Sequence, residues 1–284
     1  ATELSVMCAG TVVGELDTSV RLLIVYPTGF VSVVSDTWDL WKVLTEFLPN
    51  LKEDILSRDG KLVIRPDSGD PVDILCGSSR FIDASTYFNE SWVNTRNTED
   101  LESEELKDGL REWFEEMIIE ETPHGEHGVT EKTEFVKLGR LYLKVTLSGI
   151  QWNRHDKQYY FMDNYTSPKL EIEQVEQTPA DKGVIELLWE TFEGTFSSTG
   201  YKVLDSHIGA IYGDAITPER AKAICKRLEK KGFASTNVVL GIGSFTYTYN
   251  TRDVFGFAKK ATYVEVNGEG REIFKDPVTD DGTK

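Results

Sequence analysis

Five short apolar runs, each ending in a cluster of Gly, Ser, Asp or Arg, restrict the possible folds of this chain more than any other feature. They are residues 30–36, 61–70, 207–214, 237–244 and 261–268. Apolar runs of this length are typical of strands buried on both faces of a parallel sheet, and polar residues at their carboxyl ends are typical of functional loops. The pattern therefore predicts parallel strands with a ligand site at their carboxyl ends.

Segments with apolar residues at helical spacing follow two of these runs, as expected for the helices that connect parallel strands. After the first run, apolar residues recur at helical spacing over residues 37–48, and Pro49 is expected to end that helix. After the third run, Thr217 is the expected N-cap, Pro218 the first helical residue and Gly232 the stop. The apolar positions of this second helix are Ala221, Ile224, Cys225 and Leu228. The alternation of strands and helices predicts an α/β domain.

The segment between the second and third runs has a different pattern. Residues 103–121 form an expected acidic helix, and residues 135–147 and 158–162 are expected hairpin strands. The apolar face of the helix is Leu106, Leu110, Trp113 and Met117. We therefore predict a core made of residues 1–76 and 201–284, interrupted by an inserted α+β subdomain at 77–200.

Composition excludes several classes of protein. The net charge of −17, from 31 Lys and Arg against 48 Asp and Glu, opposes non-specific binding to nucleic acid or to an anionic membrane. The longest apolar stretches are far shorter than the roughly 20 residues that span a bilayer. Cys8, Cys76 and Cys225 lack metal-ligand spacing, so we expect reduced thiols in a cytoplasmic protein and assign no metal ligands.

The cluster that joins Arg65 and Asp67 at a strand end is the sharpest candidate site. A guanidinium binds phosphate oxygens in a fork, and a carboxylate accepts hydrogen bonds from vicinal sugar hydroxyls, so together they suit a phosphorylated sugar. The alternative is a salt bridge that caps a loop, and the spacing alone does not separate the two. A glycine-rich strand end at residues 241–244 suits a phosphate as well, although a tight turn would have the same composition.

Several motifs, in order along the chain, resemble those of the nicotinamide phosphoribosyltransferase family. They are SVVSD (32–36), IRPDSGDP (64–71), YGD (212–214), GIGS (241–244), TRD (251–253) and FKDP (274–277). The combination of IRPDSG with FKDP is specific. The resemblance covers residues 1–76 and 201–284, and the middle of the chain contributes little to it.

The resemblance implies a fold and a reaction. The fold is the α/β barrel type of the type II phosphoribosyltransferases. The reaction is transfer of phosphoribose from phosphoribosyl pyrophosphate to nicotinamide, which yields nicotinamide mononucleotide and pyrophosphate in NAD salvage. The family also implies Mg²⁺, turnover assisted by ATP, and a cytoplasmic homodimer with shared active sites.

The matched motifs assign expected roles to single residues. Arg65 is expected to contact the ribosyl phosphate and pyrophosphate, and Asp67 to hold the ribose hydroxyls. Asp36, beside the position of the family's catalytic histidine, is expected to orient a base or a bound magnesium, so that Asp36 and Asp67 are the candidate catalytic residues. The other candidate substrate-binding residues are Ser32, Gly213, Asp214, Gly243, Ser244, Arg252, Lys260 and Lys275.

Two departures from the family bear on activity. Leu4 stands where the family has the histidine that ATP phosphorylates, and because leucine cannot accept a phosphoryl group, ATP coupling is not expected. The family's amino-terminal half, which recognises the nicotinamide ring, has no counterpart, so we expect the chain to be the carboxyl-terminal part of a longer or split enzyme. Nicotinate phosphoribosyltransferase and a non-catalytic nucleotide-binding relative remain alternatives.

Overall fold

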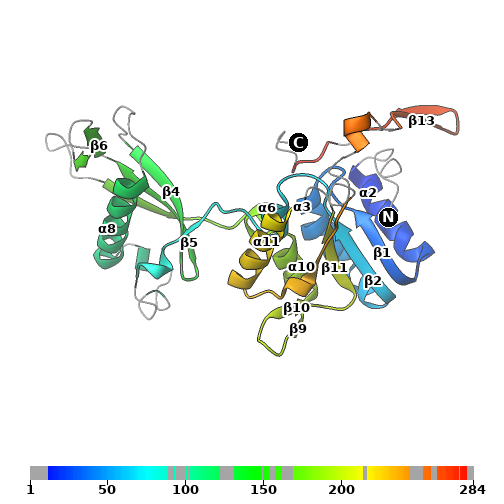
Figure 1. The fold of residues 1–284 in the computed structure, drawn as a ribbon, viewed down its shortest axis with the longest axis horizontal. Helices are drawn as coiled ribbons and strands as arrows, with labels where there is room; N and C mark the ends of the chain where they lie inside the picture. Colours follow the sequence, from blue (N-terminus) through cyan, green and yellow to red (C-terminus); the bar gives the residue numbers. More distant parts are fainter. Residues whose placement is uncertain are drawn as a thin grey trace. The chain divides into compact units, whose positions relative to one another are not determined.

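A computed structural model shows two compact units, one formed by Ala1–Ser78 with Thr178–Lys284 and the other by Ser79–Gln177 (Figure 1). Residues 178–200, which the sequence pattern placed in the insertion, lie in the first unit. The structure describes residues 12–88, 93, 100–101, 103–121, 131–148, 150–153, 158–161, 169–213, 216–243, 252–256, 261–274 and 276–279.

A four-stranded parallel sheet forms the centre of the first unit. Its strands are β1 (Thr28–Val34), β2 (Asp59–Arg65), β11 (Ile208–Tyr212) and β12 (Val238–Leu240), in the order β1-β2-β11-β12. Every neighbouring pair is parallel, and β1, β2 and β11 lie side by side in Figure 1. Four of the five predicted strands therefore occupy one parallel sheet, which confirms the predicted α/β class.

The fifth predicted strand does not join this sheet. Strand β13 (Tyr263–Val266) pairs antiparallel with β14 (Glu269–Glu272) in a largely exposed two-stranded ribbon. Asn267 and Gly268 connect the two strands with positive φ angles of 56° and 84°. An Asn-Gly pair between two short strands is the usual signal for a hairpin. It is a stronger indication of a hairpin than the preceding apolar run is of a strand in the parallel sheet.

Helices cover one face of the parallel sheet. Alternate strand residues such as Val31, Leu62 and Ile208 share a buried core with α2 (Val12–Val25), α6 (Pro71–Cys76), α10 (Val184–Phe192) and α11 (Pro218–Lys230). The predicted cap of α11 is confirmed, because the Thr217 side chain accepts a hydrogen bond from the Arg220 N–H. Cys225, however, is exposed and does not belong to the apolar stripe.

The helix after β1 continues past Pro49, so the prediction that this proline ends it was wrong. The segment runs through α3 (Leu40–Lys42), the π-helical η1 (Val43–Phe47), α4 (Leu48–Asn50) and α5 (Lys52–Leu56). In the π-turn the Leu48 N–H donates to Val43 O, five residues back. Proline has no N–H to donate, and the widened turn precedes it directly.

The second unit has its own core, built as the sequence predicted from an acidic helix and a hairpin. Helix α8 (Glu104–Glu121) buries Leu106, Leu110 and Trp113 against β4 (Glu131–Leu138) and β5 (Leu141–Ser148). The other elements of this unit are β3 (Ile82–Asp83), η2 (Ala84–Thr86), β6 (Ile150–Asn153), β7 (Gln158–Phe161) and β8 (Lys169–Gln174). Among the described residues, no helix is long and apolar enough to cross a bilayer.

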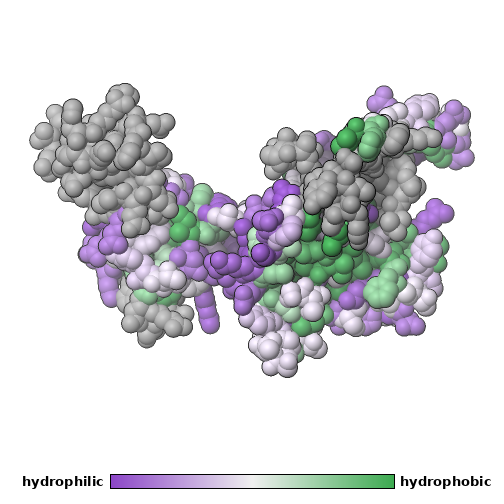
Figure 2. Space-filling view, viewed as in Figure 1, coloured by the Kyte–Doolittle hydropathy of each residue, from purple (hydrophilic) through white to green (hydrophobic). Residues whose placement is uncertain are grey.

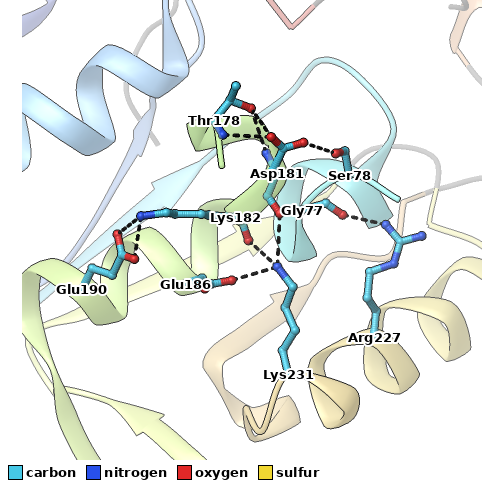
Figure 3. Close-up of polar contacts among 9 residues, drawn as sticks. All are labelled: Gly77, Ser78, Thr178, Asp181, Lys182, Glu186, Glu190, Arg227 and Lys231. Atoms are coloured by element: carbon cyan, nitrogen blue, oxygen red, sulfur yellow. Dashed lines mark hydrogen bonds and ion pairs between the residues drawn. The ribbon is translucent and has the colours of Figure 1, made fainter. Parts of the chain in front are cut away.

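The chain leaves the first unit and returns to it at one polar junction (Figure 3). The Ser78 N–H donates to Ala180 O at 2.9 Å, and Ser78 Oγ donates to Asp181 Oδ1 at 2.7 Å. Asp181 also forms a capping box with Thr178 at the start of α9 (Pro179–Lys182). Lys231 Nζ, from the end of α11, donates to Lys182 O and pairs with Glu186. The remaining elements of the first unit are β9 (Gly194–Phe196), β10 (Lys202–Leu204), η4 (Ser235–Asn237) and η5 (Arg252–Phe255).

Candidate functional site

The carboxyl ends of all four parallel strands open at one edge of the sheet. The loops stay adjacent beyond the strands, because the Ser35 N–H donates to Arg65 O at 3.2 Å and the Gly241 N–H donates to Tyr212 O at 2.8 Å. Asp36 follows β1 and Asp67 follows β2 at this edge. The edge therefore brings together residues that are widely separated in the sequence.

Asp36 ties the loop after β1 to the loop after β2. Its Oδ2 accepts hydrogen bonds from the Asp67 N–H at 2.7 Å and from Ser68 Oγ at 2.5 Å. Asp36 is fully buried and Ser68 nearly so, and Asp36 Oδ1 has no hydrogen-bond partner among the described residues. The observed contacts of Asp36 are thus with the Asp67 loop, which it holds in place.

Arg65 and Asp67 present opposite charges at the edge. Arg65 is the last residue of β2, and its guanidinium lies 3.9 Å from Asp67 Oδ1. The two side chains remain 34% and 31% exposed. A pair at this separation and exposure contributes at most about 1 kcal/mol to stability, so capping by a salt bridge explains little of the arrangement. Both charged groups are accessible to a ligand.

Asp70 has a structural position rather than a ligand-binding one. It is the N-cap of α6, and its carboxylate accepts hydrogen bonds from the Val72 and Asp73 N–H groups.

The backbone just before Asp70 is held by a tyrosine from β11. Gly69, which lies between Asp67 and Asp70, has a φ of +78°. The Tyr212 hydroxyl, which is buried, donates toward Ser68 O at 3.1 Å and Gly69 O at 2.9 Å. The YGD motif includes Tyr212, but the sequence gave no signal for these hydrogen bonds.

The face of the sheet opposite the helices carries Ser32. It alternates along β1 with the core residues Val31 and Val33, so it points to the other face. On that face Phe30 is 83% exposed and Val239 59% exposed, and Figure 2 shows hydrophobic surface around β11. Parallel sheets are almost always covered on both faces.

The glycines after β11 and β12 differ in what surrounds them. A Cβ on Gly241 would come within 2.8 Å of Gly213 Cα, so the close approach of the two loops requires glycine there. A Cβ on Gly213 or Gly243 would meet no atom within 4 Å. Among the described residues, nothing therefore fills the side-chain positions of these two glycines at the strand ends.

Other candidate residues are not placed. Arg252 begins the short helix η5, but its side chain lies outside the described part of the structure. Asp214, Ser244, Lys260, Lys275 and Leu4 also lie outside the described residues. Within the described residues, no group of three or more His, Cys, Asp or Glu side chains has the arrangement of a metal site.

Glu15 is a buried acid close to the loop after β1, and sequence reasoning gave no signal for it. It belongs to α2 and is 1% exposed. The pKa of Glu15 is raised from 4.5 to about 7, chiefly by burial and also by the Asp36 and Asp39 carboxylates, while the Thr37 backbone N–H acts in the opposite direction. Glu15 therefore carries a proton at a pH where ordinary carboxyl groups are ionised.

Comparisons with known proteins agree with the predicted family. Residues 168–284 match the sequence model of the nicotinate phosphoribosyltransferase (NAPRTase) family. A nicotinamide phosphoribosyltransferase from Acinetobacter baylyi is 41% identical over 291 aligned positions, which cover 100% of this chain and 39% of the relative. The Mycoplasma pneumoniae nicotinamide phosphoribosyltransferase is 30% identical over 280 positions, covering 99% of this chain and 42% of the relative.

The alignments also correct one expectation. The similarity runs through the middle of the chain, so residues 79–177 contribute to the resemblance instead of interrupting it. The chain spans about two fifths of the length of these relatives. Residues 168–284 thus match the family model of the nicotinate phosphoribosyltransferases, and the chain as a whole is similar to the nicotinamide phosphoribosyltransferases, which confirms the resemblance that the motifs predicted.

Proposed function

We propose that this chain provides the phosphoribosyl-binding part of an enzyme that transfers phosphoribose from phosphoribosyl pyrophosphate to nicotinamide. The products are nicotinamide mononucleotide and pyrophosphate, and the reaction belongs to NAD salvage. The observation that carries the proposal is the strand-end edge, where Arg65 and Asp67 lie side by side and partly exposed. A phosphorylated sugar needs this pairing of a forked cation with a carboxylate.

Positioning and electrostatics would perform most of the catalysis. The pyridine nitrogen attacks C1 of the ribose as pyrophosphate leaves, and negative charge grows on the leaving group. Arg65 would stabilise that charge, while Asp67 would hold the ribose hydroxyls so that C1 stays in line. The backbones of Gly213 and Gly243, with Asp214, Ser244, Arg252, Lys260 and Lys275, are proposed to complete the binding of the substrate.

Mg²⁺ is proposed to reach the site with its substrate. Magnesium usually keeps several waters and binds through one or two carboxylates together with substrate phosphates. That mode suits a described part of the chain in which no cluster of three potential ligands occurs. ATP coupling is not proposed, because Leu4 offers no nucleophile for a phosphoryl group.

The uncovered face of the sheet supports a larger assembly. Within the described part of the chain, strands β1 and β12 each pair on one side only, and Phe30 and Val239 are exposed on the face opposite the core. We propose that additional residues, from a longer enzyme or from a second subunit of a homodimer, cover this face and close the sheet into a barrel.

The proposed enzyme is cytoplasmic, in keeping with the absence of disulfides at Cys76 and Cys225, the two described cysteines.

Calorimetric titration with phosphoribosyl pyrophosphate and Mg²⁺ tests the proposal. We expect Arg65→Ala to weaken binding by at least tenfold, because charge-assisted hydrogen bonds to phosphate contribute about 1.5–3 kcal/mol. The matched control is Arg140→Ala, which removes the same charge from the second unit. Equal affinities for the natural chain and Arg65→Ala would remove Arg65 from the site.

The name of the matched family model makes nicotinate a second candidate substrate. That family is named for nicotinate, whereas the relatives similar over the whole chain are named for nicotinamide. Competition between nicotinamide and nicotinate for product formation separates the two activities. Binding of phosphoribosyl pyrophosphate without any product would instead favour a non-catalytic relative.

A further inference from the structure

A short segment near the end of the described chain lies across both loops of the proposed site. We call residues 276–279 the strap. The Asp276 N–H donates to Thr37 O at 3.1 Å, and the Val278 N–H donates to Trp38 O at 2.8 Å. Phe274, which precedes the strap, packs edge-on against Trp38 with ring centroids 5.4 Å apart. These contacts fix the strap to the loop after β1.

The last residue of the strap contacts the loop after β2. Thr279 Oγ1 lies 2.5 Å from Ser68 Oγ. A Cβ on Gly69 would come within 2.9 Å of Thr279 O, so glycine at position 69 permits this approach. The strap therefore connects the loop that contains Asp36 with the loop that contains Asp67.

The direction of the hydrogen bonds follows from the number of protons. Ser68 Oγ donates its only proton to Asp36 Oδ2. Thr279 Oγ1 must then donate to Ser68 Oγ. The result is a directed chain from Thr279 through Ser68 to Asp36, and the same Asp36 oxygen accepts the Asp67 N–H at 2.7 Å. Because Asp36 and Ser68 are buried, each of these hydrogen bonds is costly to lose.

We infer that Thr279 is a positioning residue for the proposed sugar-binding loop: its hydroxyl holds Ser68 and, through Ser68 and Asp36, the backbone of Asp67. The inference rests on the proposed function of Asp67. Without the Thr279 hydroxyl, Ser68 loses its donor in a buried setting, and the loop gains alternative conformations. Asp67 then spends less time in the orientation that grips the ribose, while Arg65, at the end of β2, keeps its position.

Two substitutions at position 279 separate positioning from packing. Thr279→Val removes the hydroxyl, keeps the shape of the side chain and leaves the backbone hydrogen bonds of Asp276 and Val278. Thr279→Ser keeps the hydroxyl and is the matched control. We expect Thr279→Val to weaken phosphoribosyl pyrophosphate binding about tenfold and to leave pyrophosphate binding unchanged, both with Mg²⁺. Thr279→Ser is expected to bind both ligands like the natural chain.

Amide hydrogen exchange gives a readout that needs no ligand. The Asp67 amide is expected to exchange about tenfold faster in Thr279→Val and at the natural rate in Thr279→Ser. Unchanged exchange of Asp67 in Thr279→Val, or equal effects of the two substitutions, would overturn the inference. If the natural chain binds neither ligand, the proposed function fails, and the exchange result alone decides the role of Thr279.

Discussion

Replacing Glu15 by glutamine is expected to raise the free energy of unfolding by about 3 kcal/mol at pH 8 and to change it little at pH 4. In the unfolded chain this carboxyl ionises at its ordinary pKa of 4.5, whereas burial in the folded protein raises the pKa to about 7. Between these values the unfolded state binds fewer protons, so the natural protein loses stability as the pH rises. A neutral glutamine does not titrate and avoids this loss.

Urea denaturation between pH 4 and pH 8 measures the effect. At each pH the free energy of unfolding of the natural protein is subtracted from that of the variant, because the other titrating groups contribute equally to both. Asp17→Asn is the matched control, because it removes a carboxylate from the exposed face of the same helix. A Glu15→Gln difference that stays constant across this pH range would show that folding does not raise the pKa of Glu15.

Gly183→Ala is expected to destabilise the first unit by at least about 3 kcal/mol. Gly183 has φ 81° and ψ 168°, a conformation that is essentially restricted to glycine. A Cβ there would lie 2.1 Å from the backbone N of Gly77, which itself has a φ of 89°. Neither backbone can move without breaking the junction that Ser78 and Asp181 form.

Gly232→Ala provides the control for this substitution. Gly232 also has a positive φ, 76°, but a Cβ there would meet no atom within 4 Å. Its cost should be only about 1 kcal/mol, from backbone strain alone. Hydrogen exchange measured by mass spectrometry should place the Gly183→Ala effect in peptides of the first unit and leave α8 unchanged. Equal losses for the two glycines would show that the contact with Gly77 relaxes easily.

Local patterns in the sequence predicted the parallel sheet, the cap of α11 and the apolar face of α8. Each of these depends on residues close together in the chain, such as Thr217 with Pro218. The strand ends also indicated Arg65 and Asp67 as neighbours, because parallel strands open at one edge. Predictions failed where a local pattern was compatible with two structures. Residues 261–268 fitted either a parallel strand or a hairpin, and Pro49 could either end its helix or follow a widened turn within it.

The contacts around Asp36 could not be predicted, because they join distant parts of the chain. Nothing near Thr279 indicates that its hydroxyl meets Ser68. Tyr212 carries no sequence signal for its hydrogen bonds to Ser68 and Gly69. The burial of Glu15 depends on packing against the loop after β1, which the period of α2 does not reveal. Such side-chain hydrogen bonds follow only from the folded arrangement.

The position of the junction determines the order in which the chain can fold during synthesis. Strands β1 and β2 are made before residues 79–177, whereas α10, β11 and α11, which share their core, are made only after that whole segment. The second unit is continuous in sequence, so its core can form first. Until Thr178 returns to Ser78, the apolar sides of β1 and β2 lack most of their partners, and exposed apolar surface of this kind favours aggregation.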